Sequence, residues 1–246
     1  MNVISYSIII PACNEELLIK TCITSATEAM SFIERTYDLF GEIVVVDHDS
    51  TDETGETGET GEIAQRLGAN VVFEPINQLA RARNTGAKAA QGKFLIFLDA
   101  DTVLLPELLK ESLFALTNQG WCGGSARLSL TGPESGLGRK RFMSAVTMLQ
   151  KTGVASDCFI FCRKEAFIAV GGFNEKYFAF EEFWFYRSIA RWGRRNNRVF
   201  RLLDNYVISS SGRKSESQFT LLKLCFPTIV PFFFYSRHLY GFWNKG

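Results

Sequence analysis

The 246-residue chain has two histidines, six cysteines with no Cys-x-x-Cys pair among them, and no apolar run of about twenty residues. Several of the cysteines fall within apolar stretches, which favours reduced thiols in a core over disulfides or a zinc site. No Gly-x-Gly-x-x-Gly follows a strand-like segment, so the sequence lacks the fingerprint of a nicotinamide-dependent dehydrogenase. The net charge of +1 provides no general attraction for nucleic acid, and we expect no nucleic-acid partner.

The first residues of the sequence do not have the pattern of a secretion signal. Residues 3–10 are apolar, but they are too few, follow no basic region and lead directly into a predicted strand. We therefore expect a cytoplasmic location. The hydrophobic content of 46% and charged content of 22% are those of an ordinary globular protein, and the length suits one α/β domain with a sizeable core.

The C-terminal segment, residues 211–246, differs in composition from the rest. Its apolar run 224–235 is shorter than a membrane-spanning helix and contains two prolines. Basic residues flank this run and Tyr240 and Trp243 lie close to it, a composition typical of a segment in a membrane interface. We predict peripheral contact of residues 219–243 with the inner face of the plasma membrane. A hairpin packed on the main domain and a homodimer contact are the alternatives.

Apolar strands alternate with amphipathic helices along the first half of the chain. This alternation predicts a parallel sheet with right-handed crossover connections and helices on both faces. In the first half we expect strands at 7–10, 42–47, 71–73 and 94–98, and helices at 15–37, 63–67, 80–90 and after Pro106. In the second half we expect strands at 121–130 and 159–162, and helices at 139–152, 164–170 and 182–192.

Asp99-Ala100-Asp101 follows the apolar strand 94–98 directly. Ligands of open α/β sheets bind at the carboxyl ends of the strands. Two aspartates spaced i, i+2 can present oxygens to one divalent cation, which can in turn hold a diphosphate. The alternative is a helix cap, in which Asp101 and Thr102 start the helix that contains Pro106.

Five short segments follow one another in order, and together they resemble glycosyltransferase family 2, the inverting nucleotide-sugar transferases of GT-A fold. They are residues 8–16 (IIIPACNEE), 43–52 (IVVVDHDSTD), 80–86 (ARARNTG), 97–101 (FLDAD), and 171–175 (GGFNE) followed by Glu181-Glu182. The resemblance covers about residues 5–205. It implies a Rossmann-like, mostly parallel sheet flanked by helices, with residues 1–115 as the nucleotide-binding half and 116–210 as the acceptor half of one domain over 1–210.

The resemblance also implies a donor site at the ends of these strands. Asp47 would accept a hydrogen bond from a uracil-type imide N–H, and Arg81 and Arg83 would bind the diphosphate near a helix N-terminus. A solvated helix face is the alternative for either arginine, and a helix cap for Asn14. The implied nucleotide-sugar-binding residues are Pro11, Ala12, Asn14, Glu15, Asp47, Arg81, Arg83, Asp99, Ala100 and Asp101.

The metal and the catalytic base follow from the same resemblance. Asp101 would bind Mn2+ or Mg2+ directly, while Asp99 bonds the ribose and assists the metal. Glu182 would take the proton from the acceptor hydroxyl, with Glu181 as second candidate. The implied reaction moves a sugar from a nucleoside-diphosphate sugar, with UDP expected, to the hydroxyl of a lipid-linked or envelope-polysaccharide acceptor. The alternative for the acid pair is a helix N-terminus that favours acidic residues.

The sequence departs from the family pattern at three places. The acid pair is Glu-Glu where the family has Glu-Asp, and His48, which we expect to be exposed, replaces an acid. Residues 207–213, where some relatives have a histidine metal ligand, contain no histidine, and His238 in the apolar tail is a poor substitute. These departures leave a non-catalytic nucleotide-sugar-binding subunit as an alternative function.

The strand before Asp99 also fits the aspartyl phosphatases of the haloacid dehalogenase superfamily. In that alternative Asp99 is the nucleophile and Asp101 the acid–base group. The pattern normally opens the chain and is followed by a second acidic cluster. Here three strands precede it, and the only later aspartates are Asp157 and Asp204, which disfavours this alternative.

Overall fold

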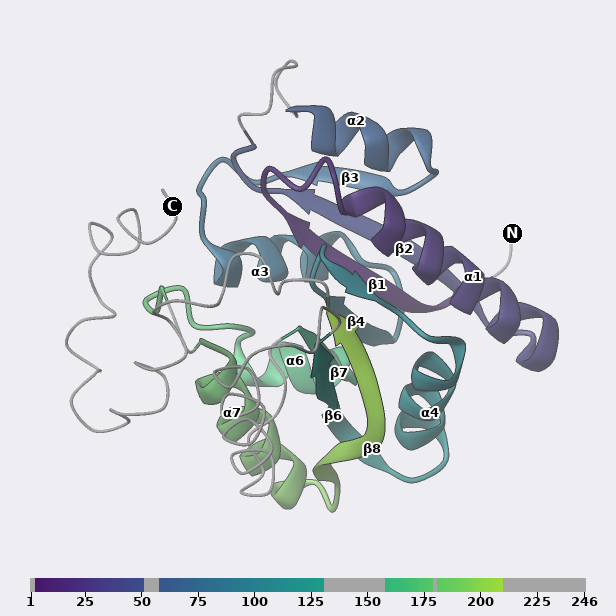
Figure 1. The fold of residues 1–246 in the computed structure, drawn as a ribbon. Coiled ribbons are helices and arrows are strands. Elements are labelled where there is room, and N and C mark those ends of the chain that lie inside the picture. Colours follow the sequence, from purple (N-terminus) through teal and green to yellow (C-terminus); the bar gives the residue numbers. More distant parts are fainter. Residues whose placement is uncertain (1–2, 51–57, 131–157, 179–180, 210–246) are drawn as a thin grey trace, which may run out of the picture.

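The computed structural model describes residues 3–50, 58–130, 158–178 and 181–209, and these form an α/β structure around one eight-stranded sheet (Figure 1). The strands are β1 (Ile4–Ala12), β2 (Phe40–Asp47), β3 (Asn70–Phe73), β4 (Phe94–Leu98), β5 (Thr102–Val103), β6 (Trp121–Leu130), β7 (Phe159–Arg163) and β8 (Val199–Ser209). The helices are α1 (Ile19–Tyr37), α2 (Gly58–Arg66), α3 (Leu79–Ala89), α4 (Pro106–Thr117), α6 (Lys164–Val170) and α7 (Glu181–Arg195).

The first four long strands form a parallel half with the order β3-β2-β1-β4. Continuous apolar runs predict strands that are buried on both faces, and the last seven residues of β1 are all buried. Alternate residues of β1 accordingly enter two cores: Ile8 and Ile10 pack with α1 and α4, whereas Ile9 packs with α3, α6 and α7. The predicted parallel sheet with helices on both faces is confirmed.

The second half adds antiparallel pairs to this sheet. β7 pairs antiparallel with both β4 and β6, and β8 lies parallel to β6 and antiparallel to the short β5. The strand over Val199–Ser209 and the two-residue β5 were not expected from the sequence. The sheet remains mostly parallel, so the predicted fold class is confirmed.

Three expectations about elements need comment. Helix α1 begins at Ile19 rather than at Glu15, because residues 15–18 form a turn closed by the N–H of Leu18 on the carbonyl of Glu15. The predicted helix 139–152 and the C-terminal segment 211–246 lie outside the described residues. Among the helices that the structure describes, none is long and apolar enough to cross a membrane.

Candidate active site

The candidate active site lies where strands β1, β2 and β4 end. β1 and β2 run parallel and pair Ala12 with Asp47 at their last residues. β4 runs parallel to β1 and ends at Leu98, so the turn 99–101 follows at the same edge of the sheet. This is the edge at which open α/β sheets bind ligands. The fold therefore brings the predicted motifs of the first half together.

Asp99-Ala100-Asp101 forms the turn between β4 and β5. The backbone N–H of Thr102 donates to the carbonyl of Asp99 at 3.0 Å and closes this turn. Thr102 begins β5, and helix α4 begins only at Pro106. The alternative that Asp101 caps this helix is therefore wrong.

The two carboxylates of this turn are partly accessible. The Asp99 side chain is 32% exposed, and the Oδ1 atom of Asp101 accepts a hydrogen bond from the Thr102 hydroxyl at 3.1 Å. The thiol of Cys22 donates to the carbonyl of Asp99 at 3.5 Å, and burial and then the charges of Asp101 and Asp99 raise the pKa of that thiol. No group of three or more His, Cys, Asp or Glu in the described part of the chain could hold a metal ion. Two carboxylates on one turn suit Mn2+ or Mg2+ held jointly with diphosphate oxygens and water.

Arg83 on α3 is a fully buried cation among three carboxylates. Its Nη1 donates to Oε1 of Glu181 at 3.1 Å and to Oε1 of Glu182 at 3.0 Å, and its Nη2 donates to Oδ1 of Asp99 at 3.3 Å. Burial acts to lower the pKa of Arg83, but the three carboxylate charges outweigh it and raise the pKa. The guanidinium thus stays charged and links the aspartate turn to the acid pair. The diphosphate contact expected of Arg83 stays a prediction.

The acid pair opens helix α7, and its two members differ in accessibility. The Glu181 side chain is only 4% exposed, whereas the Glu182 side chain is 13% exposed. Burial and the neighbouring Glu182 raise the pKa of Glu181 well above its ordinary value, against the opposing effect of Arg83. Glu181 therefore retains a proton more readily than an ordinary carboxyl group does. Glu182 is the more accessible carboxylate.

Arg81 lies two residues before Arg83 on α3 and has other partners. Its Nε donates to Oε1 of Glu74 at 3.1 Å, and its Nη1 donates to Oε2 of Glu175 at 3.0 Å. Burial acts to raise the pKa of Glu74, but the hydrogen bonds from Thr85 and Arg81 outweigh this effect. The pKa of Glu74 is therefore lower than its ordinary value. Glu74 was not among the predicted site residues, although its signal was present: it follows an apolar strand directly, as Asp99 follows β4.

Asn84 connects α3 to the turn 171–175. Its Nδ2 donates to the carbonyl of Phe173 and to Oε1 of Glu175, both at 2.9 Å, and its Oδ1 accepts the N–H of Phe173 at 2.9 Å. Gly172 has a φ of 71°, and a Cβ there would lie 2.6 Å from Oδ1 of Asn84. The Gly-Gly-Phe motif therefore has a packing reason. Its turn must approach this asparagine closely.

Asp47 is the last residue of β2 and His48 follows it, and both are buried. Oδ1 of Asp47 accepts the N–H of Ser50 at 3.2 Å, and the N–H of His48 donates to the carbonyl of Ala12 at 3.0 Å. His48 is only 7% exposed, so the expectation of an exposed histidine is wrong. Burial lowers the pKa of His48 to about 4, partly offset by a hydrogen bond with Asn77, and the imidazole is neutral near pH 7.

The loop after β1 is tied to the loop after β2. Asn14 is exposed with a φ of 54°, and its N–H donates to the Ser50 hydroxyl at 3.1 Å. The N–H of Glu15 donates to the hydroxyl of Thr60 at 3.0 Å. Because α1 begins at Ile19, Asn14 does not cap that helix. Its base or ribose contact stays a prediction.

Ten of the twelve predicted site residues fall into three groups at one edge of the sheet, whereas Asp101 bonds Thr102 on the aspartate turn and Arg81 pairs with Glu74 and Glu175. Pro11, Ala12 and Ala100 are buried. Asn14, Glu15 and Asp47 lie in the joined loops after β1 and β2. The four residues Arg83, Asp99, Glu181 and Glu182 form one ion-paired cluster.

This arrangement, a parallel half-sheet with an Asp-x-Asp turn at its carboxyl edge and an acid pair opposite, defines a glycosyltransferase of GT-A fold. A family model described as Glycosyl transferase family 2 matches residues 7–171. The chain belongs to glycosyl transferase family 2.

A curated relative agrees with this family. Glycosyltransferase AglE of Haloferax volcanii is 28% identical over 173 residues, which is 68% of this chain and 55% of AglE. The chain therefore spans about half the length of the curated relative that it matches.

Solved structures share the fold. The structure of Staphylococcus aureus TarS residues 1–349 gives a TM-score of 0.60 at 19% identity, and the match covers 84% of this chain and 60% of that fragment. The mannosyltransferase PcManGT of Pyrobaculum calidifontis, in complex with GDP-Man and Mn2+, gives a TM-score of 0.62 at 18% identity. This match covers 86% of the present chain and 58% of the PcManGT chain. Glucosyl-3-phosphoglycerate synthase of Mycobacterium tuberculosis, in complex with Mn2+, UDP and phosphoglyceric acid, gives a TM-score of 0.55 at 18% identity. This match covers 82% of the present chain and 69% of the synthase chain. The predicted GT-A fold is confirmed.

Proposed function

We propose that the chain is a metal-dependent inverting glycosyltransferase that moves a sugar from a nucleoside-diphosphate sugar, with UDP as the expected nucleotide, to an acceptor hydroxyl. One observation carries the proposal. A single buried guanidinium, Arg83, contacts both Asp99 of the aspartate turn and Glu182 of the acid pair. The groups expected to hold the donor and to deprotonate the acceptor are therefore neighbours.

The donor would bind along the edge formed by β1, β2 and β4. Asp47 and Asn14 suit the base and ribose because they lie in the two joined loops. Asp101, with Asp99, would hold Mn2+ or Mg2+ together with the diphosphate. The bound cation would neutralise the charge that develops on the departing nucleoside diphosphate. The relatives crystallised with Mn2+ and with GDP-Man or UDP support this class of donor and cofactor.

The acceptor hydroxyl would be deprotonated by Glu182. As the bond between the acceptor oxygen and the anomeric carbon forms, the bond from that carbon to the diphosphate oxygen breaks, and the hydroxyl proton passes to Oε of Glu182. Glu182 suits this role because it is more accessible than Glu181 and is paired with Arg83. Attack opposite the leaving group inverts the anomeric centre.

The apolar segment 219–243 supports an acceptor that is lipid-linked or otherwise presented at a membrane, with the enzyme in the cytoplasm and peripheral to the inner face of the plasma membrane. A homodimer through this segment is the alternative.

Two substitutions separate donor binding from transfer. Glu182→Gln removes the base but keeps the side-chain size, so we expect unchanged nucleotide affinity and a kcat lower by about 10²–10⁴-fold. Asp101→Asn removes a ligand charge, so Mn2+-dependent binding of UDP-sugars should be lost in calorimetry. The matched control is Glu111→Gln, an exposed residue of α4 outside the site.

Three outcomes would contradict the proposal. Full activity of Glu182→Gln would remove the base assignment. Nucleotide binding without transfer across many acceptors would favour a non-catalytic binding subunit. Turnover of simple phosphomonoesters that Asp99→Asn abolishes would favour a phosphatase.

A further inference from the structure

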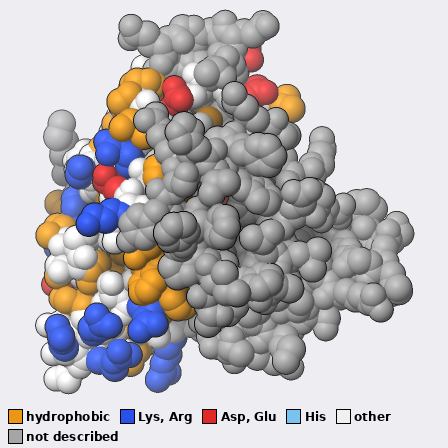
Figure 2. Space-filling model, turned by 90° about the vertical axis from the view of Figure 1, so that its left-hand side faces the viewer, with side chains coloured by type: hydrophobic (Ala, Val, Ile, Leu, Met, Phe, Trp, Pro, Cys, Tyr) orange, Lys and Arg blue, Asp and Glu red, His pale blue; other side chains and the backbone are white. Residues whose placement is uncertain are grey.

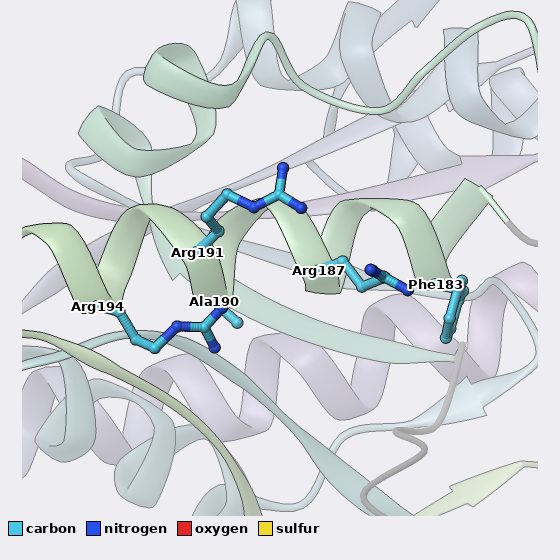
Figure 3. Close-up of a pocket in the computed structure, with 5 residues that line it drawn as sticks. All are labelled: Phe183, Arg187, Ala190, Arg191 and Arg194. Carbon is cyan, nitrogen blue, oxygen red and sulfur yellow. The ribbon is translucent and has the colours of Figure 1, made fainter.

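The outward face of helix α7 combines arginines with aromatic residues. The buried stripe of this helix consists of Glu181, Phe185, Ile189 and Gly193, which recur every four residues. Positions on the opposite side carry the residues of a surface groove: Phe183, Arg187, Ala190, Arg191 and Arg194. Figure 3 shows these five side chains on α7, with the guanidinium of Arg187 directed toward the ring of Phe183. We call this set the arginine face.

The arginine face has cations and rings in contact but no described anionic partner. The guanidinium carbon of Arg187 lies 5.7 Å from the ring centroid of Phe183 and 5.8 Å from that of Trp184. Phe183 is 45% and Trp184 38% exposed. Among the ion pairs of the described residues, none involves Arg187, Arg191 or Arg194. Figure 2 shows Lys and Arg side chains gathered beside hydrophobic ones at the lower left of the molecule.

We propose that the arginine face of α7 docks on an anionic lipid surface. Arginine on a helix face with exposed Trp and Phe is the composition that binds the headgroup region of a bilayer. Each cation near such a surface gains from its negative potential. The same face gives the aromatic rings a place at the boundary between headgroups and acyl chains.

Charge disfavours the other candidate occupants. Residues 131–157 contain four Lys and Arg against two Asp and Glu, and residues 210–246 contain five against one. Either segment would place like charge against the arginines. A second copy of the chain related by a twofold axis would set this face against itself, with the same repulsion. An anionic surface is the partner that complements the face.

The arginine face lies on the same helix as the acid pair, so its docking would also position the candidate base. α7 begins at Glu181 and Glu182, and Phe183 is the next residue. Arg187 lies about 8 Å further along the helix axis than Glu182 at the usual rise per residue. Docking would therefore hold the candidate base close to the lipid headgroups. The benefit of docking for catalysis rests on the proposed function, but the docking itself does not, because the chain can bind lipid without transferring a sugar.

The test is vesicle binding by the full chain. Partition is measured by flotation onto phosphatidylcholine vesicles with and without phosphatidylglycerol. The combined variant Arg187→Gln, Arg191→Gln and Arg194→Gln should lose about 100-fold in partition onto the anionic vesicles. The matched control is Arg35→Gln, Arg66→Gln and Arg201→Gln, which removes three exposed arginines from other elements and should change little. Replacement of the three face arginines by lysine should largely retain binding.

Several outcomes would overturn the proposal. Equal binding of the two Gln triples would assign any lipid contact to another segment, such as residues 219–243. Equal binding to neutral and anionic vesicles would remove the role of charge. Binding of soluble heparin or inorganic phosphate at this face without vesicle binding would assign it to a soluble anion. Failure of transfer assays leaves the vesicle result intact, so the two proposals fail separately.

Discussion

At the scale of single residues, Arg83 decides the electrostatics of the candidate site. One buried cation faces three carboxylates, at 3.0, 3.1 and 3.3 Å. This arrangement leaves net negative charge at the place where a divalent cation and a diphosphate are proposed to bind together. In the proposed function, Arg83 would therefore act through Asp99 and Glu182 as a positioning residue.

Removing this cation should be costly. Arg83→Met leaves three carboxylates without their buried partner, and we expect the free energy of unfolding to fall by about 3–5 kcal/mol. Arg83→Lys keeps the charge but loses the planar fork, so it should retain most of the stability and lower kcat more than it changes KM. Urea unfolding and steady-state kinetics measure the two effects. An unchanged urea midpoint for Arg83→Met would contradict the structural role.

The sequence could identify the members of this cluster but not their pairing. Asp99, Arg83 and the acid pair each belong to a recognisable motif, and all were expected at one site. The ion pairs between Arg83 and the acid pair join residues that are 98 and 99 positions apart. Such contacts depend on how α3 and α7 pack on the sheet, which no local pattern contains. The burial of His48 was missed for the same reason.

At the scale of elements, α3 is held to the turn 171–175 by Asn84. Three hydrogen bonds of one side chain, each 2.9 Å long, replace the water that a surface asparagine would bind. The same turn precedes α7, so this contact positions the helix that carries the acid pair.

Asn84→Ala should therefore destabilise the protein and loosen the site. The substitution leaves buried backbone groups of Phe173 without partners, and we expect a loss of about 2 kcal/mol in the free energy of unfolding. Because α7 loses its support, kcat should fall as well. Asn70→Ala, at an exposed position of β3, is the matched control and should have little effect on either quantity. Equal unfolding midpoints for the two variants would contradict the prediction.

Most elements could be predicted because their patterns are local. The strands over 94–98 and 121–130 and the helix over 164–170 have the expected bounds, and the other elements of the parallel half differ by a few residues. β8 was missed because Arg201 and Asp204 interrupt its apolar pattern. β5 has two residues and no pattern of its own.

At the scale of the whole molecule, a parallel half-sheet is extended by an antiparallel one. The alternation of strands and helices predicts the first, since right-handed crossovers allow few arrangements. The order β4-β7-β6-β8 depends on pairing between segments far apart in sequence, which alternation does not specify. The two halves meet at β4, and the aspartate turn follows this central strand. The site therefore lies at the point in the sheet where the strand numbering stops falling, at β1, and rises to β4.

The stability of the whole chain should depend on pH through His48. Burial lowers the pKa of this histidine from 6.5 to about 4; Arg83 acts in the same direction, while Asn77, Asp49 and Glu74 oppose it. Between these two values the unfolded chain binds a proton that the folded chain does not. The contribution of His48 to the free energy of unfolding should therefore be complete above pH 6.5. As the pH falls from 6.5 towards 4, this residue should lower the free energy of unfolding by on the order of 3 kcal/mol.

His48→Gln isolates this contribution, because glutamine cannot be protonated in this range while all carboxylates still titrate as before. We expect the unfolding free energy of the unsubstituted chain to fall more steeply than that of the variant between pH 6.5 and 4, and the two curves to run parallel above pH 7. Urea unfolding at half-unit pH steps measures the difference. Parallel curves throughout the acidic range would mean that the imidazole is protonated equally in the folded and unfolded chains. That result would place His48 in contact with water and separate it from the buried end of β2.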